Sequence, residues 1–432
     1  MKKKLLSLLL AAVSCVTLCL TGCGGNTSDT TVESDLAKQN YYRGEELLKA
    51  TVDNYFDREY NIVNQYYDFP NRAMDESIIA DIWHFSSLQE AAMYYQEISN
   101  TEYADELADD LYETLQYFVE ERSNDDYIVY GMYAAAEPGK NNEGEDLFDD
   151  NSCIVRNVIH QYKNTGDEAY YTAAENTMDW VLKYGWDTKI NTDTGEEFGG
   201  NFQGFAGTGM TYKPICANEF NMLNLIQFYN LSDTEEEKDY YLDWAKKYYE
   251  FCIETYRADS GLIADYIGLN LDRNDSSYHG SPALMEHPYS YHQGAMIEAG
   301  VRMYKATGDE TYLDDARMTA DACIEIDLLG TFINGIYQPP VNEYHWFNLC
   351  FLRGLMMLAQ VDETYDEQVQ LFQESIDYAY ENYYMDGFLP SNFVQGWLQD
   401  YEYDTRINVM DASAYAQYYF MLAIYQDGKE VA

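Results

Sequence analysis

Basic residues are scarce in this chain of 432 residues, which has 26 Lys and Arg against 75 Asp and Glu and a formal net charge of −49. A surface with this charge repels nucleic acid and anionic lipid headgroups, and it disfavours a polyanionic substrate. Neutral polysaccharides remain compatible with the charge. We therefore expect no nucleic-acid partner.

Long apolar runs are also missing after the first residues, and none approaches the roughly 20 residues that cross a bilayer. The N-terminus has three lysines followed by LLSLLLAAVSCVTLCL, which is typical of a secretory signal. The run ends in LTGC, which resembles a bacterial lipobox in which Cys23 is acylated; a plain secretory signal is the alternative. We expect a signal peptide over 1–22, a lipidated Cys23 with a flexible tether over 23–40, and one domain over 41–428. Such a chain is anchored to the membrane from outside the cytoplasm, at the cell surface.

Side chains that bind metals or act as nucleophiles form no local motif. The six His are scattered without an H-x-x-x-H pair, and neither C-x-x-C spacing nor a Gly-rich phosphate loop occurs. Five of the eight Cys follow Cys23; an odd number cannot all pair, and most lie in apolar runs, which favours buried thiols. The oxygen-rich NTDTGEE (191–197) lacks the spacing of a full calcium-binding loop. We expect no metal and no cofactor.

Similar segments recur along the chain. Each starts with a short polar turn and continues as an amphipathic helix, as in NTGDEAYYTAAENTMDWV (164–181), NLSDTEEEKDYYLDWAKKYYEF (230–251) and ATGDETYLDDARMTADAC (306–323). The Gly of TGD ends the preceding helix, and Thr or Asp caps the next one. Six segments that are apolar around most of their circumference alternate with these surface helices, which predicts that they are buried.

The alternation predicts an all-α fold, an (α/α)6 barrel of inner and outer helices. A first outer helix within YYRGEELLKATVDNYFDREYNIV (41–63) would close the ring from the N-terminal side. An open helical solenoid is the alternative, but the spacing between the turns is uneven, whereas a solenoid has a regular period.

In such a barrel all inner helices begin at one mouth, and unusual side chains gather at these starts. Aromatic rings beside carboxylates suit sugars, because rings stack on sugar faces while polar groups bind hydroxyls. For most aromatic residues core packing is the alternative. The side chains expected at this mouth are Trp83, His84, Asn218, Glu219, Tyr289, Tyr291, His292, Gln293, Tyr344, His345, Trp346 and Asp411.

The Asp149–Asp150 pair is the only one of four DD dipeptides expected to begin an inner helix. One Asp there can cap the helix, but a cap needs only one carboxylate. Two carboxylates in a restricted cleft titrate apart, so that one stays ionised while the other keeps a proton. Glycosidic cleavage uses such a pair. A short spacing gives retention and a wider one inversion, and adjacent side chains are compatible with the shorter spacing.

Several motifs occur in an order that points to a known family. They are FDD (148–150), FGGNF (198–202), CANEF around Asn218, DSGLIADYI (259–267), and YSYHQG followed by MYKATGDETYLDDA. With these motifs the chain resembles glycoside hydrolase family 76, the endo-α-1,6-mannanases, across nearly all of the domain. The resemblance implies that Asp149 is the nucleophile and Asp150 the general acid/base of a retaining hydrolase. It also adds Phe148, Gly199 and Gly200 to the expected substrate-binding residues.

Two departures from the family pattern concern the sites for individual sugars. His292 replaces the usual Asn of the YNQG motif, and the GG segment lacks the family's Trp pair. The leading hypothesis is a monomeric, lipid-anchored glycosidase acting on α-1,6-linked mannan or related α-mannosides. One alternative is a helical-barrel glycosidase with another substrate, such as an unsaturated glycuronyl hydrolase. The other is a surface glycan-binding lipoprotein without turnover, which would be favoured if either carboxyl group faced away from the cleft.

Overall fold

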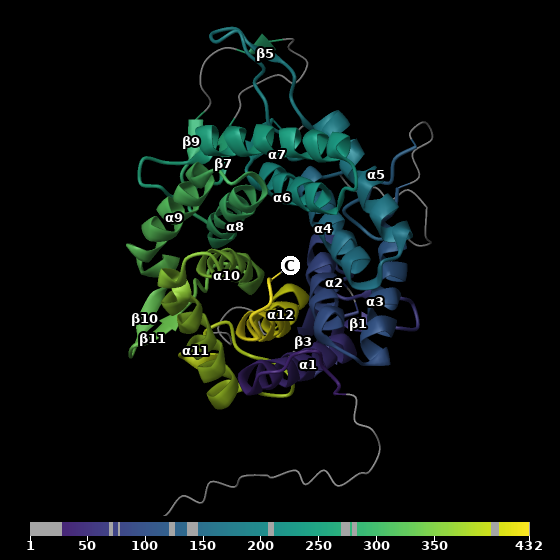
Figure 1. Cartoon of the computed structure of the whole chain (residues 1–432). Helices are drawn as coiled ribbons and strands as arrows, with labels where there is room; N and C mark the ends of the chain where they lie inside the picture. The colour runs from purple at the N-terminus through teal and green to yellow at the C-terminus, as the bar shows by residue number, and fades with distance from the viewer. Residues whose placement is uncertain are drawn as a thin grey trace, which may run out of the picture.

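The structure is a computed structural model that describes residues 28–68, 72–76, 78–120, 126–135, 146–205, 211–268, 277–278, 283–398 and 406–431. Twelve α-helices in this part of the chain form two concentric rings around a central axis (Figure 1). The predicted (α/α)6 barrel is therefore confirmed.

The inner ring contains the six segments that were predicted to be buried. Each inner helix contacts the next one, and the last contacts the first, so that the ring closes. Almost every residue of these helices is buried, as expected for segments that are apolar around most of their circumference. The inner helices are α2 (Ile82–Ile98), α4 (Phe148–Thr165), α6 (Cys216–Leu231), α8 (Ser290–Thr307), α10 (His345–Ala359) and α12 (Val409–Gln426).

The outer ring contains the amphipathic helices, each of which packs on the inner helix that precedes it. The first outer helix instead packs on α12, so it closes the ring from the N-terminal side as predicted. The outer helices are α1 (Asp35–Tyr55), α3 (Glu102–Leu115), α5 (Glu168–Gly185), α7 (Glu235–Tyr256), α9 (Glu310–Ile324) and α11 (Asp366–Tyr383).

The connections from an inner to an outer helix are short and have the predicted caps. Gly166 and Gly308 end α4 and α8 in the left-handed conformation, with φ of 71° and 73°. Asp167 and Asp309 then cap α5 and α9 by accepting hydrogen bonds from backbone N–H groups of the next turn.

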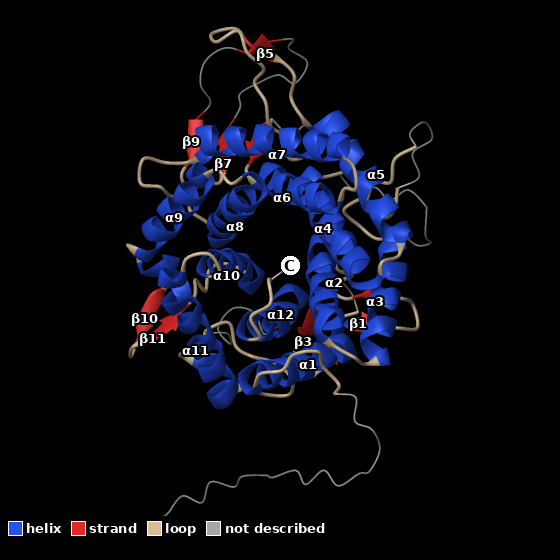
Figure 2. Cartoon of the chain, viewed as in Figure 1, coloured by secondary structure: helices blue, strands red, loops and turns tan. Residues whose placement is uncertain are grey.

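The connections that lead to inner helices are longer and contain all the described strands (Figure 2). The sheets have the orders β1-β2, β10-β11, β12-β3-β4, β5-β8 and β6-β7-β9. All pairings are antiparallel except that of β5 with β8. The strands are β1 (Phe56–Asp57), β2 (Ile62–Val63), β3 (Tyr66–Asp68), β4 (Ala73–Met74), β5 (Ile190–Asn191), β6 (Tyr212–Pro214), β7 (Tyr266–Gly268), β8 (Ser277–Tyr278), β9 (Ala283–Met285), β10 (Thr331–Ile333), β11 (Ile336–Gln338) and β12 (Arg406–Asn408).

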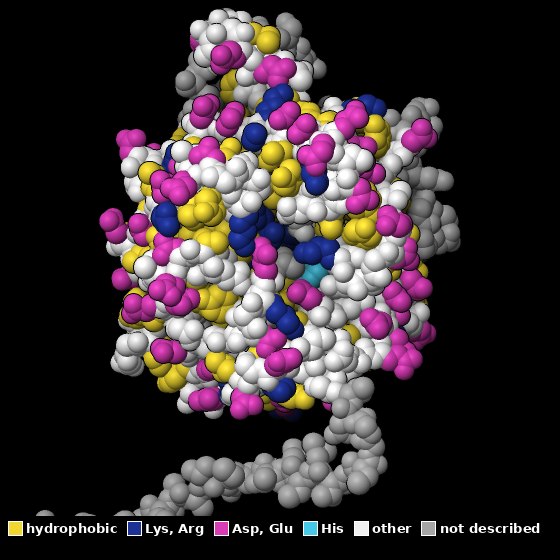
Figure 3. Space-filling view, in the orientation of Figure 1, with side chains coloured by type: hydrophobic (Ala, Val, Ile, Leu, Met, Phe, Trp, Pro, Cys, Tyr) yellow, Lys and Arg dark blue, Asp and Glu magenta, His cyan; other side chains and the backbone are white. Residues whose placement is uncertain are grey.

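Buried charges connect the inner helices inside the ring. Glu90 of α2 accepts hydrogen bonds from Arg156 of α4 and from Arg353 of α10, and Arg353 Nε lies 2.7 Å from Glu298 Oε2 of α8. Removing one partner of such a network leaves an unpaired buried charge, which costs about 3–5 kcal/mol. Figure 3 shows Lys and Arg side chains around a hollow at the centre of one face, whereas Asp and Glu side chains are scattered over the rest of that face.

The predicted domain boundary needs a correction at the N-terminal side. The flexible tether was predicted to extend to residue 40, but α1 begins at Asp35, and Thr30 already pairs with Ser99. Ser34 caps α1 by accepting a hydrogen bond from the N–H of Ala37. A Ser at this position is a local signal for the start of a helix, although the predicted tether included it. The predicted signal peptide and Cys23 lie outside the described residues. Across the described ranges, no helix is both long and apolar enough to cross a membrane.

Candidate active site

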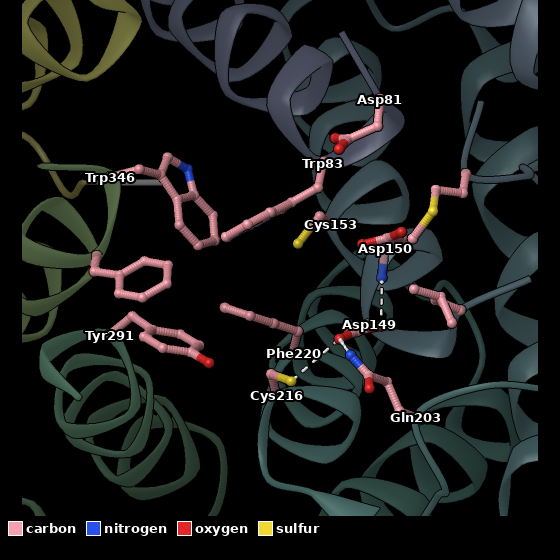
Figure 4. Close-up of a pocket in the computed structure, with 13 residues that line it drawn as sticks. Asp81, Trp83, Asp149, Asp150, Cys153, Gln203, Cys216, Phe220, Tyr291 and Trp346 are labelled. Atoms are coloured by element: carbon pink, nitrogen blue, oxygen red, sulfur yellow. Dashed lines mark hydrogen bonds between the residues drawn. The ribbon is translucent and has the colours of Figure 1, made fainter. Parts of the chain in front are cut away.

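A cavity of about 230 Å³ lies where the inner helices begin (Figure 4). Asp149 and Asp150 both line it, so neither carboxyl group faces away from the cleft. This arrangement argues against the alternative in which the pair only caps a helix and the protein only binds glycan. The lining residues are Asp81, Trp83, Met132, Leu147, Asp149, Asp150, Cys153, Gln203, Cys216, Phe220, Tyr291, Trp346 and Phe347.

The two aspartates occupy the first turn of α4. Leu147 stands at the capping position and makes no side-chain cap, so α4 starts without the side-chain bond that usually satisfies its free N–H groups. A first turn also favours negative charge because of the helix dipole. The local structure therefore tolerates two adjacent carboxylates at the wall of the cavity.

Three donors surround the Asp149 carboxylate. Its Oδ2 accepts hydrogen bonds from Cys216 Sγ and Gln203 Nε2, both at 3.2 Å, and its Oδ1 accepts one from the N–H of Asp150 at 3.1 Å. The hydroxyl of Tyr212 donates to Gln203 Oε1, which turns the amide nitrogen toward Asp149. All three donors favour the ionised form of this carboxylate.

The environment affects the pKa values of Asp149 and Asp150 to different extents. Burial raises the pKa of Asp149, and the hydrogen bonds from Cys216 and Gln203 oppose that rise. Burial also raises the pKa of Asp150 well above its usual range, and there the negative charges of Asp149 and Asp81 add to the effect. The pair thus fits one ionised and one protonated member, which is the state that glycosidases use.

Asp81 is a carboxylate of this cavity that was not predicted. It caps α2, where its Oδ1 accepts hydrogen bonds from the backbone N–H of His84 at 2.9 Å and lies 2.7 Å from His84 Nδ1. The sequence contains the signal for the cap, an Asp directly before an apolar helix. Nothing in the sequence places that cap beside Asp150, because α2 and α4 are brought together only by the barrel.

Aromatic rings form the remaining walls of the cavity. The rings of Trp83 and Phe347 lie 5.8 Å apart between centroids, and those of Tyr291 and Phe347 lie 4.1 Å apart. Trp346 is held from behind, since its Nε1 donates to Glu90 Oε2 at 2.8 Å. Flat apolar walls beside carboxylates suit the face of a sugar ring.

A second cavity, of about 610 Å³, shares Tyr291 and Phe347 with the first. The predicted residues Tyr289 and Tyr344 line it, together with several carboxylates. The two cavities thus adjoin at this mouth, and together they are called the cleft. The lining residues of the second cavity are Asp265, Tyr289, Tyr291, Val341, Asn342, Glu343, Tyr344, Phe347, Ser391 and Asp411.

Five predicted substrate-binding residues thus line the cleft, and their contact with substrate stays a prediction: Trp83, Tyr289, Tyr291, Tyr344 and Trp346. Eight others line neither cavity, and their contact with substrate also stays a prediction: His84, Phe148, Gly199, Gly200, Asn218, His292, Gln293 and His345. In each case the side chain or backbone has a supporting contact within the protein.

Polar side chains among these eight hold loops in place. Asn218 Oδ1 accepts from the N–H of Asn201 at 2.7 Å, and Gln293 bonds both backbone groups of Ile263 at 2.8 Å. His345 is fully buried, with Nε2 2.9 Å from the backbone oxygen of Ser391. Buried polar groups need such partners, and a backbone atom satisfies them as well as a ligand does.

Three more of these residues make packing contacts or shape a turn. The Phe148 ring lies 4.8 Å from that of Trp180, in the layer between α4 and α5. Gly199 and Gly200 have φ of 79° and 67°, and a Cβ on Gly200 would overlap the ring of Phe251. These glycines therefore serve a turn that L side chains rarely adopt and a close approach, which is a structural requirement.

His292 lies behind the cleft, between two carboxylates. It is fully buried, with Nδ1 2.8 Å from Glu219 Oε1 and Nε2 3.3 Å from Asp265 Oδ1. Of these three residues only Asp265 reaches the second cavity. His292, which replaces the usual Asn of the YNQG motif, thus contacts the cleft indirectly, through Asp265.

Paired carboxylates in an aromatic cleft at one mouth of an (α/α)6 barrel are the features of a glycoside hydrolase. The sequence model of Glycosyl hydrolase family 76 matches residues 40–428, and the chain belongs to this family. It is therefore a glycoside hydrolase. The match also decides against the unsaturated glycuronyl hydrolases as its family. No curated protein sequence matches the chain significantly.

Solved structures of the family have the same fold. A family 76 glycoside hydrolase from a bovine Bacteroides thetaiotaomicron strain has a TM-score of 0.73 at 20% identity, covering 90% of this chain and 78% of that one. A family 76 mannosidase of B. thetaiotaomicron VPI-5482 has a TM-score of 0.72 at 21% identity, over 90% and 99%. An inactive variant of an α-1,6-mannanase from Salegentibacter sp. HEL1_6, in complex with α-1,6-mannotriose, has a TM-score of 0.66 at 18% identity, over 89% and 99%.

Proposed function

We propose that this glycoside hydrolase cleaves α-1,6-linked mannan or related α-mannosides, with Asp149 as nucleophile and Asp150 as general acid/base. The observation that carries the proposal is that both carboxyl groups line one cavity, where the pKa of Asp150 is raised well above its usual range while hydrogen bonds oppose the rise for Asp149. Support for the sugar comes from the Salegentibacter mannanase, whose variant with two neighbouring Asp replaced by Asn is inactive and binds α-1,6-mannotriose.

The proposed reaction proceeds by two displacements. In the first, Asp149 attacks the anomeric carbon while Asp150 gives its proton to the leaving glycosidic oxygen, which forms a covalent mannosyl-enzyme. In the second, Asp150 takes a proton from water, the water oxygen attacks the anomeric carbon, and the Asp149 carboxylate leaves. Two inversions give overall retention of the anomeric configuration. Trp83, Tyr291 and Phe347 would stack against the sugar during both steps.

The test of catalysis is release of reducing ends from linear α-1,6-mannan by the chain from residue 24 onward, which retains every described element. Asp149→Asn and Asp150→Asn should each abolish hydrolysis with unchanged folding by circular dichroism. The matched control is Asp314→Asn, from another DD dipeptide, because the Asp314 side chain is 70% exposed on α9. Hydrolysis that survives in both cavity variants would overturn the assignment of the pair.

Proton NMR of the first-formed product tests the stereochemistry. A retaining enzyme releases the α anomer first, and mutarotation then produces the β anomer. Initial release of the β anomer would overturn the double displacement while leaving the hydrolase activity in place.

We also propose that the protein acts while anchored at the cell surface. The motif LTGC supports acylation of Cys23 and anchoring outside the cytoplasm. Labelled palmitate should enter the full chain when it is expressed in bacteria, and Cys23→Ala should lose both the label and the membrane fraction. Equal membrane association of the two chains would contradict the anchor.

A further inference from the structure

Cys216 is a thiol in the candidate active site to which the proposed reaction gives no role. It is the first residue of α6 and lines the cavity that contains Asp149 and Asp150. Its Sγ lies 3.2 Å from Asp149 Oδ2. The other described cysteines are free and buried too, and of those only Cys153 lines this cavity.

The hydrogen bond runs from the thiol to the carboxylate. Burial and the charges of Asp149 and Glu219 raise the pKa of the Cys216 thiol well above its usual range, so the sulfur keeps its proton near neutral pH. A neutral thiol beside a carboxylate oxygen is a donor. In return, this bond is the largest of the contacts that oppose the effect of burial on the pKa of Asp149.

The position of Cys216 also restricts where the Asp149 oxygens lie. Cys216 approaches from α6 and Gln203 from the preceding connection, and both donate to the same oxygen, Oδ2. The backbone of α4 donates to Oδ1. The carboxylate is thus held from three separate segments of the chain, and loss of the donor from α6 removes one of these three restraints.

We propose that Cys216 is a positioning residue, whose thiol orients Asp149 and keeps it ionised for attack on the sugar. The role rests on the proposed function of Asp149 as nucleophile. It applies to both displacements, because the carboxylate charge that the thiol stabilises is present before attack and returns when the mannosyl-enzyme breaks down.

The first experiment is the pH profile of mannan hydrolysis by the full chain, Cys216→Ala and Cys216→Ser. Loss of a hydrogen bond to a charged group predicts a fall in kcat of about tenfold or more for the Ala variant, with little change in KM. The acidic limb of kcat/KM should move to higher pH in that variant. Serine retains a donor at this position and should restore both the rate and the limb. An unshifted limb in Cys216→Ala, or an effect confined to KM, would overturn the proposal.

A second experiment measures the contact without any turnover. In a Cys153→Ala background, the rate at which methyl methanethiosulfonate modifies Cys216 is followed by peptide mass across the pH range. Asp149→Asn removes the negative charge beside the thiol, so we expect Cys216 to react at lower pH than with Asp149 present. Unchanged reactivity in a folded Asp149→Asn protein would contradict the contact.

The two experiments separate the two proposals. If thiol reactivity responds to Asp149→Asn but the native chain does not hydrolyse mannan, the contact stands and the proposed substrate fails. If hydrolysis depends on Asp149 but neither the pH limb nor the thiol reactivity responds, the proposed function stands and the positioning role fails.

Discussion

His292 and Glu219 form a fully buried pair, with His292 Nδ1 2.8 Å from Glu219 Oε1. The other ring nitrogen faces Asp265 Oδ1 at 3.3 Å. Only an imidazolium donates from both nitrogens. Burial on its own lowers the pKa of His292, but the charges of Glu219 and Asp265 and their hydrogen bonds outweigh it and raise the pKa to about 9. A positive charge therefore lies behind the second cavity and fixes Asp265 at its wall.

This imidazolium should make stability depend on pH in the alkaline range. Because the folded pKa of about 9 exceeds the unfolded value of about 6.5, the contribution is complete below the unfolded pKa. It disappears as the pH rises through the folded pKa. Between pH 7 and 9.5 the native chain should lose about 2 kcal/mol of unfolding free energy that His292→Asn does not lose. Urea unfolding at both pH values measures this difference.

His345→Asn is the matched control for the pH effect. His345 is equally buried, but its ring faces a backbone oxygen, and burial lowers its pKa to about 4. Its replacement should change stability by the same amount at pH 7 and pH 9.5. A constant difference between the native chain and His292→Asn over this range would contradict a charged His292.

Asp81 should set the alkaline limit of activity through Asp150. Its negative charge is one of the causes that raise the pKa of Asp150. Asp81→Asn removes the charge but retains a good helix cap, so the Asp150 pKa should fall. The alkaline limb of kcat/KM reports the general acid and should move to lower pH. Profiles of mannan hydrolysis by the two chains measure the shift.

Asp309→Asn makes the same change at a distance. Asp309 also caps a helix, α9, but it lies at the opposite mouth and lines neither cavity. Its pH profile should match that of the native chain. A limb that moves equally in both variants would show that general surface charge causes the effect, and not the charge of Asp81.

The fold could be predicted because its determinants are local. The caps at Gly166, Asp167, Gly308 and Asp309 act within one turn, and the contrast between apolar and amphipathic helices separates the two rings. Once inner and outer helices are distinguished, the packing of each outer helix on its neighbouring inner helix leaves few possible topologies. The start of α1 at Asp35 was misplaced because the small polar residues before it resemble a tether as much as a cap.

The sequence predicted the position of the site better than it predicted which residues line it. Asp149 and Asp150 stood out because two adjacent charges at a buried helix start have no structural need. Asn218, Gln293 and His345 were assigned to substrate because a polar group at a helix start suits a ligand and a backbone partner equally. Cys216 was read correctly as a buried thiol, but its bond to Asp149 spans 67 residues and has no local signal.

Tyr344 should affect long substrates more than short ones. It lines the second cavity but not the one that contains the aspartates. Tyr344→Ala should therefore lower kcat/KM on long α-1,6-mannooligosaccharides by about tenfold, or roughly 1.4 kcal/mol, and leave the shortest cleaved oligomer nearly unaffected. Phe332→Ala, an exposed aromatic on β10, is the control and should change neither rate. An equal loss on every chain length would place Tyr344 beside the cleaved bond.

Gly294 should be essential for the contact between α8 and α10. A Cβ there would overlap the backbone of Cys350 and Phe351, and one on Gly354 would overlap Gly294 in turn. In an open helix, Gly→Ala stabilises by about 0.5–1 kcal/mol. Here the clash is with backbone, which cannot move aside as a side chain does, so Gly294→Ala should destabilise by about 1–3 kcal/mol.

Urea unfolding of Gly294→Ala, Gly354→Ala and the double variant checks whether Ala destabilises the fold here, whereas in an open helix it stabilises. Because both glycines serve one contact, the second substitution should cost less once the first has separated the helices. Separation would also displace Tyr291 and His292, which precede Gly294 on α8, so mannan hydrolysis should fall together with stability. A Gly294→Ala chain at least as stable as the native one would mean that α8 and α10 do not pack at backbone contact.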